Sequence, residues 1–112
     1  MKSYLNAVLM VTAIYAGTSY AEETVERDII TMGCHKENGN CFMEINGEPV
    51  GPSECIANSV RFNILSDKNA EASFTLLSAA FFSGKKVRFT ISDQCYSQQN
   101  TFPTFTRFQV LN

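Results

Sequence analysis

The sequence predicts a mainly β domain with one helix, in the order β-β-β-α-β-β. Three observations predict it: short segments in which apolar and polar residues alternate, one segment of helical periodicity between the third and fourth of these, and turn residues at the junctions. Short strands with one apolar face and a helix after the third favour a five-stranded OB-like barrel, whose helix plugs one end. An α+β sandwich, with the helix packed on an antiparallel sheet, is the alternative.

The first 21 residues have the three-part layout of a secretory signal peptide. Lys2 precedes an apolar run over residues 7–16, and small residues then lead to Ala21, immediately before the acidic Glu22. The apolar run is too short for the roughly 20 residues that a transmembrane helix needs. We therefore expect cleavage after Ala21, a secreted or periplasmic location in a bacterium, and a single OB-like domain over residues 22–112.

The charge of the mature chain disfavours two classes of partner. Cleavage after residue 21 leaves 91 of the 112 residues, which allows one domain with a modest core. Without Lys2, eight Lys and Arg stand against 11 Asp and Glu, a net charge of −3 with His35 neutral. The bases are scattered apart from a small group at residues 85–88, so we expect no nucleic-acid partner. No basic amphipathic helix indicates a membrane surface, and we expect no membrane insertion.

All four cysteines lie in the mature chain: Cys34, Cys41, Cys55 and Cys95. An even number in a short exported protein predicts two disulfides, because small domains in oxidising compartments use such bridges to supplement a thin core. Three pairings are possible, and sequence alone does not select one of them.

Two strands are predicted in the first half of the domain. Residues 28–32 are rich in β-forming residues and stop at Gly33, and the polar residues 22–27 before them are either frayed or part of a short first strand. The polar turn "HKENGN" follows, and residues 41–45 then alternate as a strand that ends at Asn46-Gly47, a dipeptide suited to a tight reversal. The outward positions of this second strand are Phe42 and Glu44.

The third strand, the helix and the last two strands follow a proline-containing loop. Residues 59–65 alternate as a strand, residues 68–83 form the helix, and Gly84 supplies its left-handed stop. Residues 85–91 alternate again, and a final strand covers about residues 104–111. The predicted helix N-caps are Ser66 and Asp67. The inward positions of the fourth strand are Val87, Phe89 and Ile91.

The helix has more apolar surface than one core requires. At about 100° per residue, its core stripe consists of Ala70, Phe74, Leu77 and Phe81. Phe82 falls on a second face that is otherwise polar, and a third group beyond it consists of Ala72, Leu76 and Ala79. One interpretation is that Phe82 tucks under the following loop. The other is that the helix packs against copies of itself in a ring, with the third group and Phe82 at the subunit interface.

Nothing in the sequence indicates catalysis. The one histidine, His35, neighbours Cys34, but a nucleophile needs a base oriented by a third group, and cysteines of an exported protein are expected to be paired. The spacing does not fit a zinc site, and no phosphate-binding or hydrolase motif is present. We therefore expect a binding module without metal, cofactor or enzymatic activity. Its acidic charge favours an oligosaccharide over an oligonucleotide as the ligand of an OB-type barrel.

Three segments resemble a known family: "CFMEINGEPVGPSEC", "NSVRF" and "SFTLLSAAFFSGKKVRFTI". Over residues 29–91 the chain resembles the B subunits of subtilase cytotoxin and of pertussis-like AB5 toxins. The resemblance implies a secreted OB-fold homopentamer with helices around a central pore, a face that binds host glycans, and a separate catalytic A subunit as partner. It also implies the pairing Cys41–Cys55, which leaves Cys34–Cys95.

The resemblance and the predicted strands together nominate residues for glycan binding. This chain departs from the toxin subunits in two ways. Glu26 or Arg27 occupies the place of the serine that recognises sialic acid near their first strand, and the paired cysteines near their C-terminus are absent. The candidates are outward polar and aromatic residues near the first strand and the last loop: Glu26, Arg27, Arg61, Tyr96, Gln98 and Gln99. The competing hypothesis is a monomeric periplasmic or secreted protein that binds or inhibits another protein.

Overall fold

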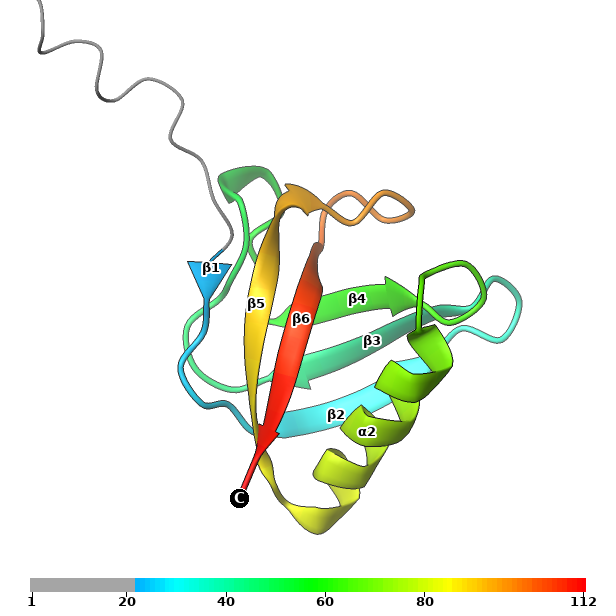
Figure 1. The fold of residues 1–112 in the computed structure, drawn as a ribbon. Helices are drawn as coiled ribbons and strands as arrows, with labels where there is room; N and C mark the ends of the chain where they lie inside the picture. The colour runs from blue at the N-terminus through cyan, green and yellow to red at the C-terminus, as the bar shows by residue number, and fades with distance from the viewer. Residues whose placement is uncertain (1–21) are drawn as a thin grey trace, which may run out of the picture.

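The computed structural model describes residues 22–112, and the predicted signal peptide lies outside the described residues (Figure 1). In chain order the elements are β1 (Glu22–Glu23), β2 (Ile29–Cys34), β3 (Asn40–Ile45), a 3₁₀ turn η1 (Ser53–Cys55), β4 (Ser59–Asn63), α2 (Ala70–Ser83), β5 (Lys86–Cys95) and β6 (Pro103–Leu111).

The strands form one mixed sheet in the order β1-β5-β6-β4-β3-β2. All neighbours are antiparallel except β4 and β6, which run parallel. The prediction of a mainly β domain with one helix is confirmed. The five-stranded barrel is not, because the sheet has six strands and its edges, β1 and β2, do not join in a ladder. The wholly antiparallel sheet of the alternative sandwich is also excluded by the β4–β6 pair.

Residues 22–34 supply both edge strands of this sheet, β1 and β2. At their start β1 pairs with β5, and the N–H of Thr24 donates to the carbonyl of Phe89 at 2.8 Å. Arg27 and Val87 then exchange two backbone hydrogen bonds of 2.8 and 2.9 Å, after which β2 pairs with β3. The polar residues 22–27 are therefore held against β5 rather than frayed.

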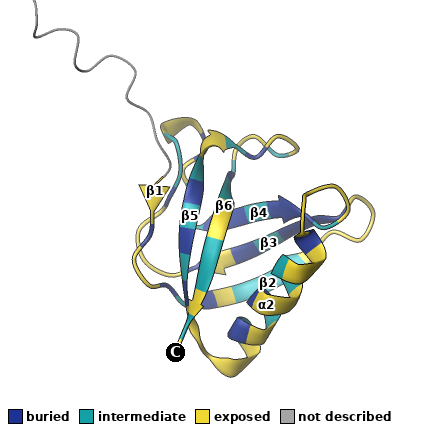
Figure 2. Ribbon diagram, in the orientation of Figure 1, coloured by how far each residue is buried: buried dark blue, intermediate teal, exposed yellow. Residues whose placement is uncertain are grey.

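The core lies between the sheet and α2, which contacts β2 and β6 (Figure 2). The predicted helix stripe is confirmed, since Ala70 and Leu77 are buried and Phe74 and Phe81 are half-buried against the core. The predicted inward positions of β5 are likewise fully buried: Val87, Phe89 and Ile91. Complete burial of a side chain such as Leu77 stabilises the fold by about 1.5–3 kcal/mol.

The helix starts later than predicted and ends where expected. α2 begins at Ala70 because Asn69 is left-handed, with φ of 55°, and neither Ser66 nor Asp67 caps it. The Asp67 carboxylate instead accepts the backbone N–H of Asn63 at 2.8 Å, which turns the chain at the end of β4. Gly84 supplies the predicted stop: its φ is 72° and its N–H donates to carbonyls of the last turn.

The disulfides are Cys34–Cys41 and Cys55–Cys95. The pairing implied by the toxin resemblance, Cys41–Cys55 with Cys34–Cys95, is wrong. Antiparallel register places Cys34 of β2 directly opposite Cys41 of β3, with their Cα atoms 3.9 Å apart. Cys55 in η1 lies beside the end of β5, and its Cα is 5.9 Å from that of Cys95.

Arg27 is a buried structural residue, contrary to the prediction that it contacts a glycan. Its Nη1 donates to the backbone carbonyls of Asn46 and, at 2.9 Å, Glu48. Gly47 between them has φ of 90°, and a Cβ there would clash with the same nitrogen. The guanidinium therefore holds the turn between β3 and η1 closed against the first strand segment.

We expect Arg27→Met to destabilise the protein by about 1–3 kcal/mol, because two carbonyls lose a charged donor. Urea unfolding followed by circular dichroism measures the change. The matched control is Arg88→Met, whose partner Glu26 lies 3.6 Å away in a half-exposed pair and contributes at most about 1 kcal/mol. Equal effects of the two substitutions would contradict the structural role of Arg27.

Candidate functional site

A cluster of aromatic and polar side chains covers the outer face of β3 and β4. We call it the outer-face cluster and define it as Phe42, Arg61, Gln99 and Phe102. Phe42 and Arg61 are cross-strand neighbours, and the guanidinium carbon of Arg61 lies 5.2 Å from the centroid of the Phe42 ring. Loop 96–102 brings Phe102 to the other side, where the same carbon is 3.6 Å from its centroid. Each such cation–π contact contributes about 0.5–2 kcal/mol.

The guanidinium of Arg61 has one nitrogen available to a ligand. Its Nε donates to the Ser59 hydroxyl at 2.9 Å, and its Nη1 donates to the Gln99 side-chain oxygen at 2.8 Å. Its Nη2 forms no hydrogen bond within residues 22–112. Burial lowers the pKa of Arg61 and the neighbouring Glu44 opposes this shift, but an arginine stays charged at neutral pH.

A glycine allows the Phe42 ring to lie against the sheet. Gly33 of β2 pairs with Phe42, and a Cβ at Gly33 would lie 2.8 Å from the tip of the ring. The His35 ring lies beside it, with the two centroids 5.9 Å apart. The half-buried Phe42 ring is therefore a platform on the outer face.

A polar network beside the outer-face cluster holds loop 96–102. The Asn63 side-chain nitrogen lies 3.0 Å from three acceptors: the Asn38 carbonyl and the side-chain oxygens of Asn40 and Gln98. The Tyr96 hydroxyl donates to the same oxygen of Asn40. Because Tyr96 and Gln98 belong to loop 96–102, the network fixes the loop that carries Gln99 and Phe102.

The structure brings together four of the six predicted glycan contacts. Arg61 and Gln99 belong to the outer-face cluster, and the exposed Gln98 lies in the adjoining network. Tyr96 is buried in that network, contrary to the prediction that it faces outward. The other two lie elsewhere, with Glu26 exposed beside Arg88 of β5 and Arg27 buried at the turn after β3. Phe42 and Phe102 were not predicted as site residues. The alternation of β3 places Phe42 outward, which was a signal that could have found it.

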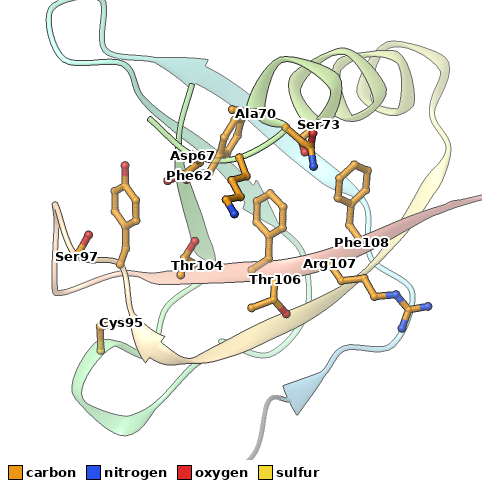
Figure 3. A pocket seen from close by; sticks show the side chains of 14 residues that line it. Phe62, Asp67, Ala70, Ser73, Cys95, Ser97, Thr104, Thr106, Arg107 and Phe108 are labelled. Atoms are coloured by element: carbon orange, nitrogen blue, oxygen red, sulfur yellow. The ribbon is translucent and has the colours of Figure 1, made fainter. Parts of the chain in front are cut away.

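Apart from this cluster, a hollow of about 670 Å³ lies between the start of α2 and β6 (Figure 3). We call it the β6 pocket. Its aromatic wall consists of Phe62, Phe105 and Phe108, and its polar residues include Lys68, Ser73 and Thr104. Tyr96 lines it too, so loop 96–102 separates this pocket from the outer-face cluster.

The four predicted interface residues of α2 are all exposed: Ala72, Leu76, Ala79 and Phe82. Phe82 is 83% exposed and contacts the ring of Phe81, with centroids 5.1 Å apart. The interpretation that Phe82 tucks under the following loop is therefore wrong. The face presents apolar side chains that nothing within residues 22–112 covers.

Comparison with known proteins does not identify a relative. No family model, no curated protein and no solved structure matches this chain. Within residues 22–112, no group of His, Cys, Asp and Glu side chains is arranged to hold a metal ion. The same residues contain no helix with the length and apolar character of a membrane span.

Burial raises the pKa of Tyr96, the only tyrosine of residues 22–112. A raised pKa means that the folded state favours the neutral phenol. Its contribution to stability is therefore complete below the unfolded pKa of about 10 and is lost as the pH rises through the folded value. We expect the free energy of unfolding to fall more steeply above about pH 10 in the wild type than in Tyr96→Phe.

Denaturant unfolding at a series of alkaline pH values measures this difference, and tyrosinate absorbance reports the ionisation of Tyr96 directly. Parallel pH profiles for the two proteins, or ionisation at the pH typical of a free tyrosine, would contradict the buried network.

Proposed function

We propose that this chain is an exported, non-catalytic protein that binds host-surface glycans and acts as the binding subunit of an AB5-type toxin. The observation that carries the proposal is the outer-face cluster, in which Arg61 lies between two aromatic rings. A sugar ring has a face of weakly positive C–H groups, which packs on the electron-rich face of an aromatic ring such as Phe42, and its hydroxyls accept hydrogen bonds from a free guanidinium nitrogen. The cluster combines both kinds of contact.

The strand order supports an OB-like barrel as the scaffold. In an OB fold the fifth strand lies between the third and the fourth. If β2 to β6 are counted as strands one to five, β6 lies between β4 and β5 in the same way. Residues 22–34 supply both edge strands, with β1 paired to β5 and β2 paired to β3, and the Arg27–Val87 bridge between them supports closure of the barrel through this one segment. OB folds bind oligosaccharides on their second and third strands and on the loop between the fourth and fifth. These are β3, β4 and loop 96–102, where the outer-face cluster lies.

The disulfides and the N-terminal sequence pattern support export. The two disulfides within residues 22–112 fit an oxidising compartment outside the cytosol. The leader-like pattern of residues 1–21 supports cleavage near Ala21 and a secreted or periplasmic protein. An exported protein meets the glycans of a host cell surface directly.

The uncovered face of α2 supports assembly into a ring. By the resemblance to the toxin B subunits, this ring is a pentamer that carries a catalytic A subunit. Leu76 and Phe82 are 53% and 83% exposed. Exposed apolar side chains of this size on one helix favour a protein partner. The small Ala72 and Ala79 beside Leu76 allow a neighbouring backbone to approach closely.

The same exposed residues also favour the competing function, a monomeric secreted or periplasmic protein that binds or inhibits a different protein. In that case Leu76 and Phe82 contact the target, and the chain has no reason to self-associate. The native mass of the purified protein distinguishes the two functions.

The first test is a glycan array, probed with protein expressed from the full-length sequence and purified with both disulfides formed. We expect one saturable class of glycans, and we expect Phe42→Ala to weaken it at least about tenfold through loss of ring stacking, about 1.4 kcal/mol. The matched control is Val25→Ala, which truncates an exposed apolar side chain that belongs neither to the cluster nor to α2. An array without any saturable class would overturn the proposal, as would undiminished binding by Phe42→Ala.

The second test concerns assembly. We expect wild-type protein to be oligomeric in light scattering at micromolar concentration, and Leu76→Glu to be a folded monomer, because a carboxylate would be buried in the interface. Thr75→Glu adds the same charge to the polar side of α2 and is the control. A wild-type protein that is already monomeric would remove the ring and leave the competing function.

A further inference from the structure

The β6 pocket is a second cavity that glycan binding on the outer face does not use. Its volume of about 670 Å³ lies within the roughly 300–1,000 Å³ typical of small-molecule sites. No member of the outer-face cluster lines it. Figure 3 shows its residues arriving from both sides, with Ala70 and Ser73 from α2 above and Phe108 and Thr104 from β6 below.

The apolar wall of the pocket is a rigid aromatic assembly. Phe105 packs edge-on against Phe62 and Phe108, with both centroid distances 5.7 Å. Phe89 lies behind them, fully buried, at 5.6 Å from Phe105 and 6.5 Å from Phe108. Phe105 and Phe108 are only half-buried, so they present apolar surface that is already held in place by its neighbours. A bound ring compound would pack on them without ordering the side chains first.

The pocket also carries an unpaired positive charge. Lys68 lines the cavity and forms no ion pair within residues 22–112. The one carboxylate of the lining, Asp67, already accepts the backbone N–H of Asn63. The side chain of Arg107 runs away from α2 (Figure 3). Because Arg107 points away, Lys68 is the one cation of the lining that is available to pair with an anionic ligand.

We propose that the β6 pocket binds a compact apolar ring compound that bears one anionic group, a carboxylate or a sulfonate. Its rings pack on Phe105 and Phe108, and its anion pairs with the ammonium group of Lys68. This site acts independently of the outer-face cluster, and its occupancy does not depend on assembly.

Two fluorescent probes that differ mainly in charge test the proposal. Anilinonaphthalenesulfonate carries the anion, and phenylnaphthylamine is the neutral counterpart with the same aromatic framework. We expect the wild-type protein, with both disulfides formed, to bind the sulfonate with a Kd at least about tenfold lower than that of the neutral probe, and to melt at a higher temperature in its presence. Lys68→Met keeps the side-chain length and should equalise the two Kd values.

Three further variants distinguish the β6 pocket from the rest of the surface. Lys85→Met removes an exposed lysine outside the pocket and should leave the preference unchanged. Phe82→Ser removes the exposed ring of α2 and should leave both Kd values unchanged. Ser73→Trp fills the cavity and should abolish binding of both probes, provided that its circular dichroism spectrum matches the wild type. Equal Kd values in the wild type overturn the proposal, as does a preference that survives Lys68→Met or binding that is lost in Phe82→Ser.

Discussion

Both candidate binding surfaces depend on one buried side chain, the amide of Asn63. Its nitrogen contacts the turn before β3 and loop 96–102, and its oxygen accepts the backbone N–H groups of Leu65 and Ser66 at 2.9 Å each. Asn63 is buried, so loss of these bonds would leave its amide unsatisfied, at a cost of about 1–3 kcal/mol. The outer-face cluster and the β6 pocket lie on opposite sides of the loop that this amide holds. The shape of both surfaces thus depends on one polar network around Asn63 rather than on two separate sets of contacts.

The two disulfides stabilise the same polar network. Cys41 directly follows Asn40, whose side chain accepts from Asn63 and from Tyr96, and Cys95 directly precedes Tyr96. Each bridge therefore fixes the backbone beside one member of the polar network. In a small domain with a thin core such bridges supplement hydrophobic packing. At these positions they also hold the partners of buried hydrogen bonds in place.

Local sequence patterns predicted the elements of this fold better than their pairing. Periodicity located the buried stripe of α2 through Ala70 and Leu77, and Gly84 marked its end, because both signals act within a few residues. The disulfides depend on strand register, which places Cys34 opposite Cys41 and which no local pattern encodes. The site was predicted in part for the same reason: Arg61 was expected to face outward, but its position between two rings depends on β3 and on a distant loop. Arg27 looked exposed because the carbonyls that bury it belong to a turn 19 to 21 residues later.

The pairing of the first strand segment with β5 has a consequence for the order of folding. The hydroxyl of Thr24 accepts the N–H of Phe89, a contact between residues 65 positions apart. Contacts so distant in sequence close late, since the chain must lose the entropy of a long loop before it gains them. Because the chain is synthesised from N- to C-terminus, the first residues of the domain cannot pair until β5 has been made. Until then the sheet has an unpaired edge that is open to aggregation. Chaperone protection of the newly synthesised chain would matter most during that interval.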